Sequence, residues 1–323
     1  MTHLLHQTKF LQKCAGTFAL VITALIWGLA FSAQRYGVDL IPPDQFLAIR
    51  SWIGCAVLIP VALTLDHFSG AGFSLWGIRK SAEDKKNLLC GGLLCGLVLF
   101  CASLLQQMGM VYASAGKAGF LTALYIVIVP VLGIFLKRRT SRLLWLAVGI
   151  VLGGTWLLCG GMTGAWDPGD FLLLGCALCF ALHIVVIDRF VQRADCVRLS
   201  ILQFLITAVF STISVEITGG TWDPVLLQKA LTALLFCGIG SSGIAYTLQI
   251  VGQKYVHPVA ASLIMSLESV FSVVGGWLVL GEILTVRELT GCGLILLAVV
   301  LAQLPCADAP AQSGQTTKKE EMV

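Results

Sequence analysis

The sequence is divided into ten largely apolar blocks, each long enough to cross a bilayer as a helix. A hydrocarbon core about 30 Å thick takes roughly 17 to 25 helical residues, and the helix must satisfy its own backbone polar groups because no water is present. The predicted spans are Cys14–Gln34, Phe46–Leu65, Leu88–Val111, Ala118–Leu136, Leu143–Met162, Phe171–Ile187, Leu199–Ile217, Ala230–Val251, Val259–Leu280 and Leu289–Leu304. A multi-pass membrane protein is therefore predicted.

Composition excludes a soluble globular protein. Hydrophobic residues make up 57% of the chain and charged residues 12%, about half the ~25% charge of a soluble domain. The net charge of +4 does not indicate a nucleic-acid partner, because the basic residues lie singly or in short clusters between apolar blocks. We expect the lipid bilayer to surround the chain and no nucleic acid to bind it.

Lysine and arginine are distributed unevenly between the two sides of the predicted membrane. Short cytoplasmic loops retain these residues, whereas translocated loops are depleted of them. With the N-terminus inside, the cytoplasmic segments hold 16 of them and the opposite side holds five, namely Arg35, Arg50, Lys117, Lys229 and Arg287. We therefore expect an inner-membrane protein of a bacterial-type cell with both termini in the cytoplasm.

The chain also repeats itself. A shift of 143 residues aligns Gln106 with Gln249, Gly109 with Gly252, Tyr112 with Tyr255 and Tyr125 with Glu268, and a shift of 153 aligns Gly16 with Gly169 and Arg50 with Gln203. Each half holds five blocks, and because five is odd, the second half enters the membrane upside down. Since the first block has a repeat partner, we interpret it as a span rather than a cleaved secretory signal.

This repeat predicts an all-α integral membrane protein with ten transmembrane helices arranged as two inverted five-helix repeats. The predicted segments are a cytoplasmic stretch 1–13, a first repeat 14–162, a second repeat 163–304 and a disordered cytoplasmic tail 305–323. Two similar halves of this kind allow a central site to open alternately to each side.

Several motifs resemble those of one known family. They are Ile26-Trp27-Gly28 followed by Phe31, Ala48-Ile49-Arg50, the stretch from Gly119 to Leu124 leading to Pro130, and the segment SLESVFSVVGGWLVLGE from Ser266 to Glu282. Over roughly residues 15 to 304 the chain is similar to the drug/metabolite transporter superfamily, specifically its ten-span EamA-type members. The resemblance implies a secondary carrier of small metabolites, commonly an exporter of amino acids or related compounds, with a central cavity between the halves.

Two charged side chains inside the spans are candidates for chemistry. Glu268 is the only carboxylate deep within a span, where an ionised group costs at least ~2.5 kcal/mol. Either it faces the cavity and pairs with a substrate ammonium or exchanges a proton, or it stabilises the bundle through one hydrogen bond. Arg50 either holds an anionic substrate group or extends to the interface near the end of its span.

Other polar and aromatic side chains inside the spans complete the predicted substrate site. They are Trp27, Phe31, Gln34, Gln106, Gln107, Tyr125, His183, Tyr246 and Gln249. The repeat places Gln106 opposite Gln249 and Tyr125 opposite Glu268, as expected of a central site. The alternative for each residue is a hydrogen bond between helices, worth ~0.6 kcal/mol, or a place in an interfacial aromatic belt.

No cofactor or metal site is predicted. His183 has no second ligand at helical spacing. Gly238 to Gly243 fits a dinucleotide fingerprint by letter, but it lies within a span, where we expect small residues to serve helix packing or bending. We expect the same packing role for Gly92 with Gly96 and for Gly149 with Gly153. The twelve cysteines are scattered and imply no disulfide framework.

The function predicted from these features is secondary transport of a small molecule, without enzymatic activity. Two alternatives stay open at this point: an integral-membrane enzyme that modifies lipid, and a membrane scaffold or sensor that transports nothing. The enzyme is disfavoured because the longest loop offers only Asp66-His67 and Glu83-Asp84 as acidic or imidazole groups. The sequence leaves the substrate, the coupling ion and the formation of a homodimer undecided.

Overall fold

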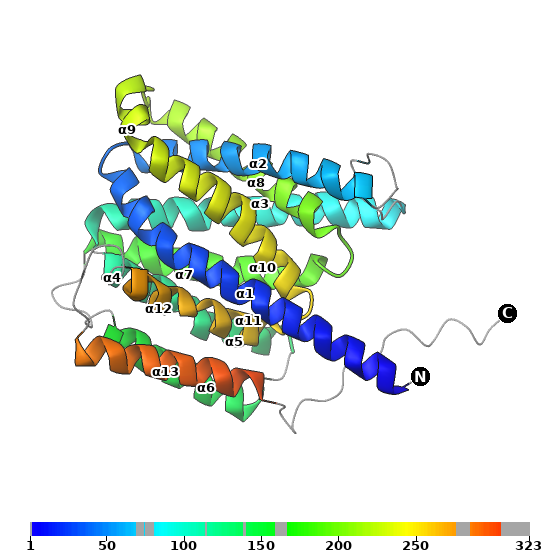
Figure 1. The fold of residues 1–323 in the computed structure, drawn as a ribbon. Helices are drawn as coiled ribbons and strands as arrows, with labels where there is room; N and C mark the ends of the chain where they lie inside the picture. Colours follow the sequence, from blue (N-terminus) through cyan, green and yellow to red (C-terminus); the bar gives the residue numbers. More distant parts are fainter. Residues whose placement is uncertain are drawn as a thin grey trace.

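The computed structural model is a bundle of helices with roughly parallel axes (Figure 1) and describes residues 2–68, 74, 81–113, 115–137, 140–158, 167–275 and 285–304. No strand occurs within these ranges. The helices are α1 (Thr2–Val38), α2 (Pro43–Phe68), α3 (Ala82–Tyr112), α4 (Ala115–Ala123), α5 (Tyr125–Phe135), α6 (Arg142–Leu158), α7 (Pro168–Phe190), α8 (Cys196–Ile217), α9 (Pro224–Leu235), the π-helix η1 (Phe236–Ala245), α10 (Tyr246–Gln253), α11 (Pro258–Met265), α12 (Leu267–Gly275) and α13 (Val286–Gln303).

Helices correspond to all ten predicted spans. Eight helical stretches are long and apolar enough to cross a membrane, and two shorter apolar stretches, Arg142–Leu158 and Pro258–Val274, fill the remaining places. Three spans consist of consecutive pieces, which are α4 with α5, α9 with η1 and α10, and α11 with α12. The protein is therefore an all-α multi-pass membrane protein, as predicted.

The ends of several spans differ from the prediction. The first helix is longer than the predicted first span, because α1 begins at Thr2 within the predicted segment 1–13 and runs without a break to Val38. Figure 1 shows the N-terminal end of α1 extending beyond the bundle. The predicted ends of the fifth and ninth spans at Met162 and Leu280 lie outside the described residues, as do Glu282 and the tail 305–323.

Polar side chains mark where many of these helices begin. Asp167 caps α7 in a reciprocal capping box with Asp170, and Thr285 caps α13 in the same way with Glu288. Such side chains satisfy backbone N–H groups that have no partner within the helix. In α7, Pro168 follows the capping residue Asp167 at the first helical position, where the N–H that proline lacks would have no partner within the helix.

Contacts between helices recur in the two halves. A Cβ built on Gly16 of α1 would lie 3.0 Å from the Tyr255 Cβ and 3.1 Å from the Gly252 carbonyl oxygen. A Cβ built on Gly169 of α7 would lie 2.6 Å from the Tyr112 Cβ and 3.1 Å from the Gly109 carbonyl oxygen. Each of these residues is the repeat partner of its counterpart. Matched contacts of this kind support two equivalent halves.

Close helix approach at glycine is confirmed at one predicted pair and wrong at the other. Gly92 and Gly96 of α3 lie directly against Leu202 and Ile206 of α8. Around Gly149 and Gly153 of α6 nothing lies within 4 Å of an added Cβ. The neighbouring Gly154 packs against α13 instead, since a Cβ built on it would lie 2.8 Å from the Gly291 carbonyl oxygen. The packed face of α6 is therefore rotated by one residue from the predicted one.

The same substitution at two glycines should show how much tight packing at one of them contributes to stability, because the change in helix propensity is the same at both. Gly28→Val is expected to destabilise the protein by about 1 to 3 kcal/mol or to prevent folding, through overpacking. Its added atoms would meet the Glu268 carbonyl oxygen at 2.6 Å and the Phe271 Cβ at 2.8 Å. Gly149→Val is the control, because space is open there. Thermal unfolding in detergent measures both, and equal unfolding temperatures would contradict this packing.

One end of the bundle is joined by an ion-pair cluster between the starts of α4 and α7. Lys117 Nζ lies 2.7 Å from Asp170 Oδ1 and 3.1 Å from Asp167 Oδ2. The Asp170 side chain is almost fully buried, with 1% exposed, whereas Asp167 is partly exposed. The hydrogen bond from Lys117 holds the pKa of the Asp167 carboxyl below its ordinary value. The cluster therefore ties the two halves together by charge.

Replacing Lys117 with methionine should lower the unfolding temperature at neutral pH. A carboxyl with a lowered folded pKa stabilises above its unfolded pKa of about 4, and this contribution is lost as pH falls through the folded pKa. The difference from wild type should therefore shrink when unfolding is followed from about pH 7 to pH 3. Lys229→Met, at an exposed position of α9, is the control. Identical unfolding temperatures of Lys117→Met and wild type at neutral pH would refute a stabilising role for the ion-pair cluster.

Candidate functional site

A polar cavity lies inside the bundle, between helices of both halves. Its lining residues are Trp27, Phe31, Gln34, Arg50, Gln106, Thr122, Tyr125, Phe180, Ile184, Ser241, Tyr246, Gln249, Met265 and Glu268. The cavity volume is about 40 Å³, which holds a few water molecules. Small-molecule sites usually enclose ~300 to 1,000 Å³, so this cavity is much smaller than such a site.

Two interrupted helices meet at this cavity. Leu124 is a single turn residue between α4 and α5, and Ser266, one position before the repeat partner of Leu124, is a single turn residue between α11 and α12. Tyr125 directly follows the first break and Glu268 lies two residues after the second. The Tyr125 hydroxyl donates a hydrogen bond of 3.4 Å to Glu268 Oε1. Because the two residues are repeat partners, their contact lies where the two halves meet. Discontinuous helices are a recurring feature of binding sites in secondary carriers.

Arg50 contributes the positive charge of the cavity. Its Nη1 donates a 2.6 Å hydrogen bond to Gln34 Oε1, and only 3% of the residue is exposed. The prediction left Arg50 either extended to the interface or facing the interior, and the structure places it inside, among the cavity residues. Arg50 and Glu268 thus bring a guanidinium and a carboxyl group to one small space.

Trp27 and Tyr246 form an aromatic wall of the cavity, and Phe204, which does not line the cavity, packs against Tyr246. The ring centroids of Trp27 and Tyr246 lie 4.7 Å apart, and those of Phe204 and Tyr246 lie 5.4 Å apart. Ring contacts at these separations stabilise by about 0.5 to 1.5 kcal/mol each beyond area burial. The wall presents an apolar surface beside the charged groups, so the cavity combines both kinds of contact.

Three buried polar atoms of cavity residues have no hydrogen-bond partner within the described part of the chain. They are Trp27 Nε1, Arg50 Nε and Gln249 Oε1. A buried polar atom left unpaired costs about 1 to 3 kcal/mol, so native proteins normally satisfy it with protein, water or ligand. Two of the three are donors and one is an acceptor, and this set would complement a polar solute with both acceptor and donor groups.

Two predicted residues do not line the cavity. Gln107 is fully buried, and neither of its side-chain polar atoms has a partner within the described ranges. His183 is also fully buried, and its Nε2 lies 3.0 Å from Gln203 Oε1. His183 contacts the Tyr246 ring at 6.0 Å between centroids, behind the aromatic wall. No group of three potential metal-binding side chains occurs within the residues described.

The structure adds five residues that the sequence prediction missed: Thr122, Phe180, Ile184, Ser241 and Met265. Thr122 lies within the motif from Gly119 to Leu124, and Met265 lies three residues before Glu268, so proximity to known motifs was a usable signal for both. Phe180 and Ile184 are four residues apart on one face of α7. No sequence pattern distinguishes them from other apolar span residues.

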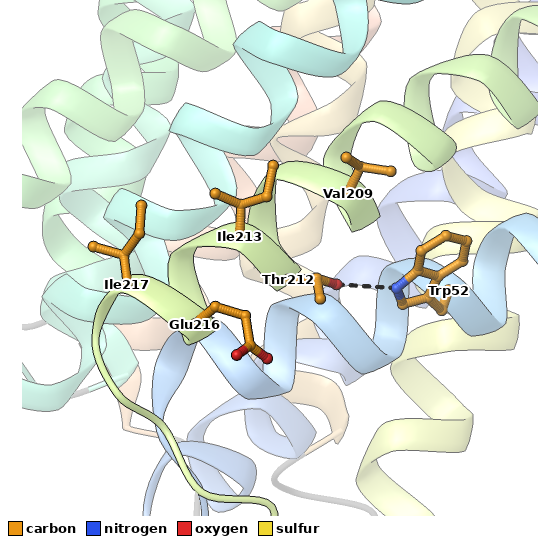
Figure 2. Close-up of a pocket in the computed structure, with 6 residues that line it drawn as sticks. All are labelled: Trp52, Val209, Thr212, Ile213, Glu216 and Ile217. Atoms are coloured by element: carbon orange, nitrogen blue, oxygen red, sulfur yellow. Dashed lines mark hydrogen bonds between the residues drawn. The ribbon is translucent and has the colours of Figure 1, made fainter.

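A second pocket lies on the surface between α2 and α8, as Figure 2 shows. It has a volume of about 410 Å³ and is lined by Trp52, Val209, Thr212, Ile213, Glu216 and Ile217. Trp52 Nε1 donates a 3.1 Å hydrogen bond to Thr212 Oγ1, which joins α2 to α8 at the pocket. Ile217 is 80% exposed and Ile213 46%, as expected of helices that face lipid. We assign the pocket to the lipid-facing surface.

Comparisons with known proteins agree on one family and one fold. The family described as "EamA-like transporter family" matches residues 15–160 and 167–304. An "Uncharacterized transporter" of Archaeoglobus fulgidus is 29% identical over 306 residues, 91% of this chain and 87% of that protein. "Uncharacterized transporter YvbV" of Bacillus subtilis is 26% identical over 302 residues, 91% of this chain and 93% of that protein. A solved structure described as "Crystal structure of protein" has a TM-score of 0.72 at 21% identity, covering 90% of this chain and 96% of the other.

Proposed function

We propose, from the premise that this chain belongs to the EamA-like transporter family, that it is a secondary transporter exporting amino acids or related amphipathic solutes. The observation that carries the proposal is the cavity between the halves, which holds Arg50 and Glu268 beside an aromatic wall. A solute with a carboxylate, an amine and an apolar body would complement these three features. The proposal includes the absence of enzymatic activity.

Each charged group has a distinct role in this proposal. The Arg50 guanidinium would bind the carboxylate of the solute, with Trp27 Nε1 as a second donor, because both keep an unpaired N–H. Glu268 would accept the solute ammonium, or release and take up a proton between solute-bound and solute-free states, while Tyr125 holds its carboxyl in place. Trp27 and Tyr246 would cover the apolar part of the solute.

Transport requires the cavity to change size and access. At about 40 Å³ it cannot enclose a metabolite, so the lining helices must move apart when a solute enters. The matched contacts of the two halves, such as Gly16 with Gly252 and Gly169 with Gly109, supply equivalent packing surfaces on both sides of the site. Exchange between two similar packings would open the cavity to one side and then to the other.

The proposed location is the inner membrane of a bacterial-type cell with both termini in the cytoplasm. The bias of 16 against five Lys and Arg residues supports this orientation. Two reporters are fused to the C-terminus in turn, one that is active only in the cytoplasm and one that is active only after export. We expect the cytoplasmic reporter to be active, and activity of the exported reporter would reverse the assignment.

Metabolite profiling tests the transport function. Cells expressing wild type, the Glu268→Gln variant or an empty vector are compared by untargeted profiling of medium and cytosol. We expect one chemical class to accumulate in the medium only with wild type. Identical profiles from all three cultures, followed by the absence of uptake and exchange in proteoliposomes with each of the L-amino acids, would refute an amino-acid exporter.

A further inference from the structure

The eighth span contains an unusual helical segment. Between α9 and α10, the ten residues of η1 form a π-helix, in which the Tyr246 N–H donates to the Ser241 carbonyl oxygen five residues earlier. π-Helices are rare, usually span a single turn and occur frequently at functional sites. The equivalent span of the first half, α3, is an α-helix throughout. The two halves therefore differ at this place.

The difference corresponds to one extra residue in the second half. A Cβ on Gly96 would meet the Ile206 Cβ and the Gln203 carbonyl oxygen, and a Cβ on Gly238 would meet the Ile53 Cβ and the Arg50 carbonyl oxygen. Ile206 and Gln203 are the repeat partners of Ile53 and Arg50, so Gly96 and Gly238 are equivalent.

A second equivalent pair lies further along the same helices. A Cβ on Gly109 would meet the Leu173 side chain and the Gly169 carbonyl oxygen. A Cβ on Gly252 would meet the Leu20 side chain and the Gly16 carbonyl oxygen, which belong to the repeat partners of Leu173 and Gly169. Gly96 and Gly109 are 13 positions apart, whereas Gly238 and Gly252 are 14 apart. One residue is inserted between two fixed contacts, and a helix with hydrogen bonds from i to i+5 accommodates it.

The insertion changes which side chains reach the cavity. Ser241 lines the cavity and is 2% exposed, and within the described chain its hydroxyl has no hydrogen-bond partner. Its counterpart is Leu99 when counted from the first glycine pair and Val98 when counted from the second. Both are apolar and neither lines the cavity. At this position, therefore, only the half with the extra residue places a polar side chain in the cavity lining.

We propose that the inserted π-helix makes Ser241 a specificity-determining residue, whose hydroxyl binds the same acidic solute group as Arg50. Both residues line the same cavity, and Gly238, three residues before Ser241, packs against the Arg50 backbone. The unpaired Arg50 Nε and Gln249 Oε1 in the same cavity indicate that a polar ligand belongs there. This inference rests on the proposed transport function.

Kinetic comparison of two neighbouring serines tests the role of the hydroxyl. Uptake of each labelled L-amino acid into proteoliposomes is measured for wild type, Ser241→Ala and the control Ser242→Ala, whose Cβ packs against Gly54 outside the cavity. For solutes that wild type carries, we expect Ser241→Ala to raise KM about tenfold with kcat within about twofold. Ser242→Ala should match wild type. An unchanged KM for Ser241→Ala overturns the inference while leaving transport established.

Thiol labelling tests the placement of Ser241 without any assay of flux. The variants Ser241→Cys and Ser242→Cys are exposed in membranes to a small cationic methanethiosulfonate, and peptide mass spectrometry identifies the modified residue among native cysteines. Ser241→Cys should react at least tenfold faster, since it alone faces the cavity. Equal rates overturn the placement. If wild type carries no amino acid, the proposed substrate class fails, and the labelling still decides whether the insertion brings Ser241 into the cavity.

Deletion of Gly240 tests the insertion itself. An added Cβ at Gly240 would have no atom closer than 3.6 Å, so removing this residue disturbs few contacts. We expect the shortened helix to become α-helical like α3, the variant to reach the membrane in normal amount, and the Ser241→Cys labelling advantage to disappear in this background. Retention of both the labelling advantage and wild-type transport would refute a role for the extra residue.

Discussion

Glu268→Gln should lower the initial rate of transport by at least about tenfold and remove its dependence on pH. The substitution keeps the size of the side chain and its ability to accept the hydrogen bond from Tyr125, but it removes the ability to ionise and to exchange a proton. Among the described residues that line the cavity, Glu268 is the only acidic one. Rates measured in proteoliposomes at several pH values, with the amount of inserted protein determined in parallel, check this expectation.

A matched control separates this effect from general damage. Glu216→Gln removes a carboxylate from the exposed end of α8, in the surface pocket rather than the central cavity, and should transport like wild type. Tyr125→Phe should have a smaller effect than Glu268→Gln, because it removes one 3.4 Å hydrogen bond and leaves the carboxyl in place. Wild-type rates for Glu268→Gln at every pH would assign Glu268 a purely structural role.

Arg50→Gln should raise KM by about tenfold to a hundredfold for solutes with a carboxylate, since a charge-assisted hydrogen bond contributes about 1.5 to 3 kcal/mol. The variant should still fold, because Gln203 occupies the equivalent place in α8 and is fully buried there. Uptake kinetics with each L-amino acid and with its carboxyl-amidated analogue measure the effect. The amidated analogues should be carried poorly by wild type and lose little more in the variant.

The control for this second substitution is Arg287→Gln, at an exposed position at the start of α13. It changes the net charge equally and should leave KM unchanged. Arg50→Gln could instead lower the amount of folded protein while the folded variant keeps the wild-type KM. In that case Arg50 stabilises the bundle through Gln34 and does not bind the solute.

Much of this protein follows from sequence alone, because a bilayer makes strong local demands. A run of apolar residues long enough to span the core must be a helix, so the ten spans could be located without knowledge of their contacts. Polar side chains are expensive within those spans, so Arg50, Glu268 and the cavity glutamines Gln106 and Gln249 stood out. The aligned halves also paired Tyr125 with Glu268, and the structure brings those two side chains into contact.

Tertiary packing determined which face of each helix points inward, and that is not a property of hydropathy. In a span that is apolar all round, a rotation by one residue changes the buried side without changing the composition. For this reason Gly154 rather than Gly149 contacts α13, and Gln107 lies outside the cavity beside its neighbour Gln106. The position of Ser241 likewise depends on tertiary packing. The glycine contacts on either side of η1 are fixed, so the extra residue between them changes which side chains face the cavity.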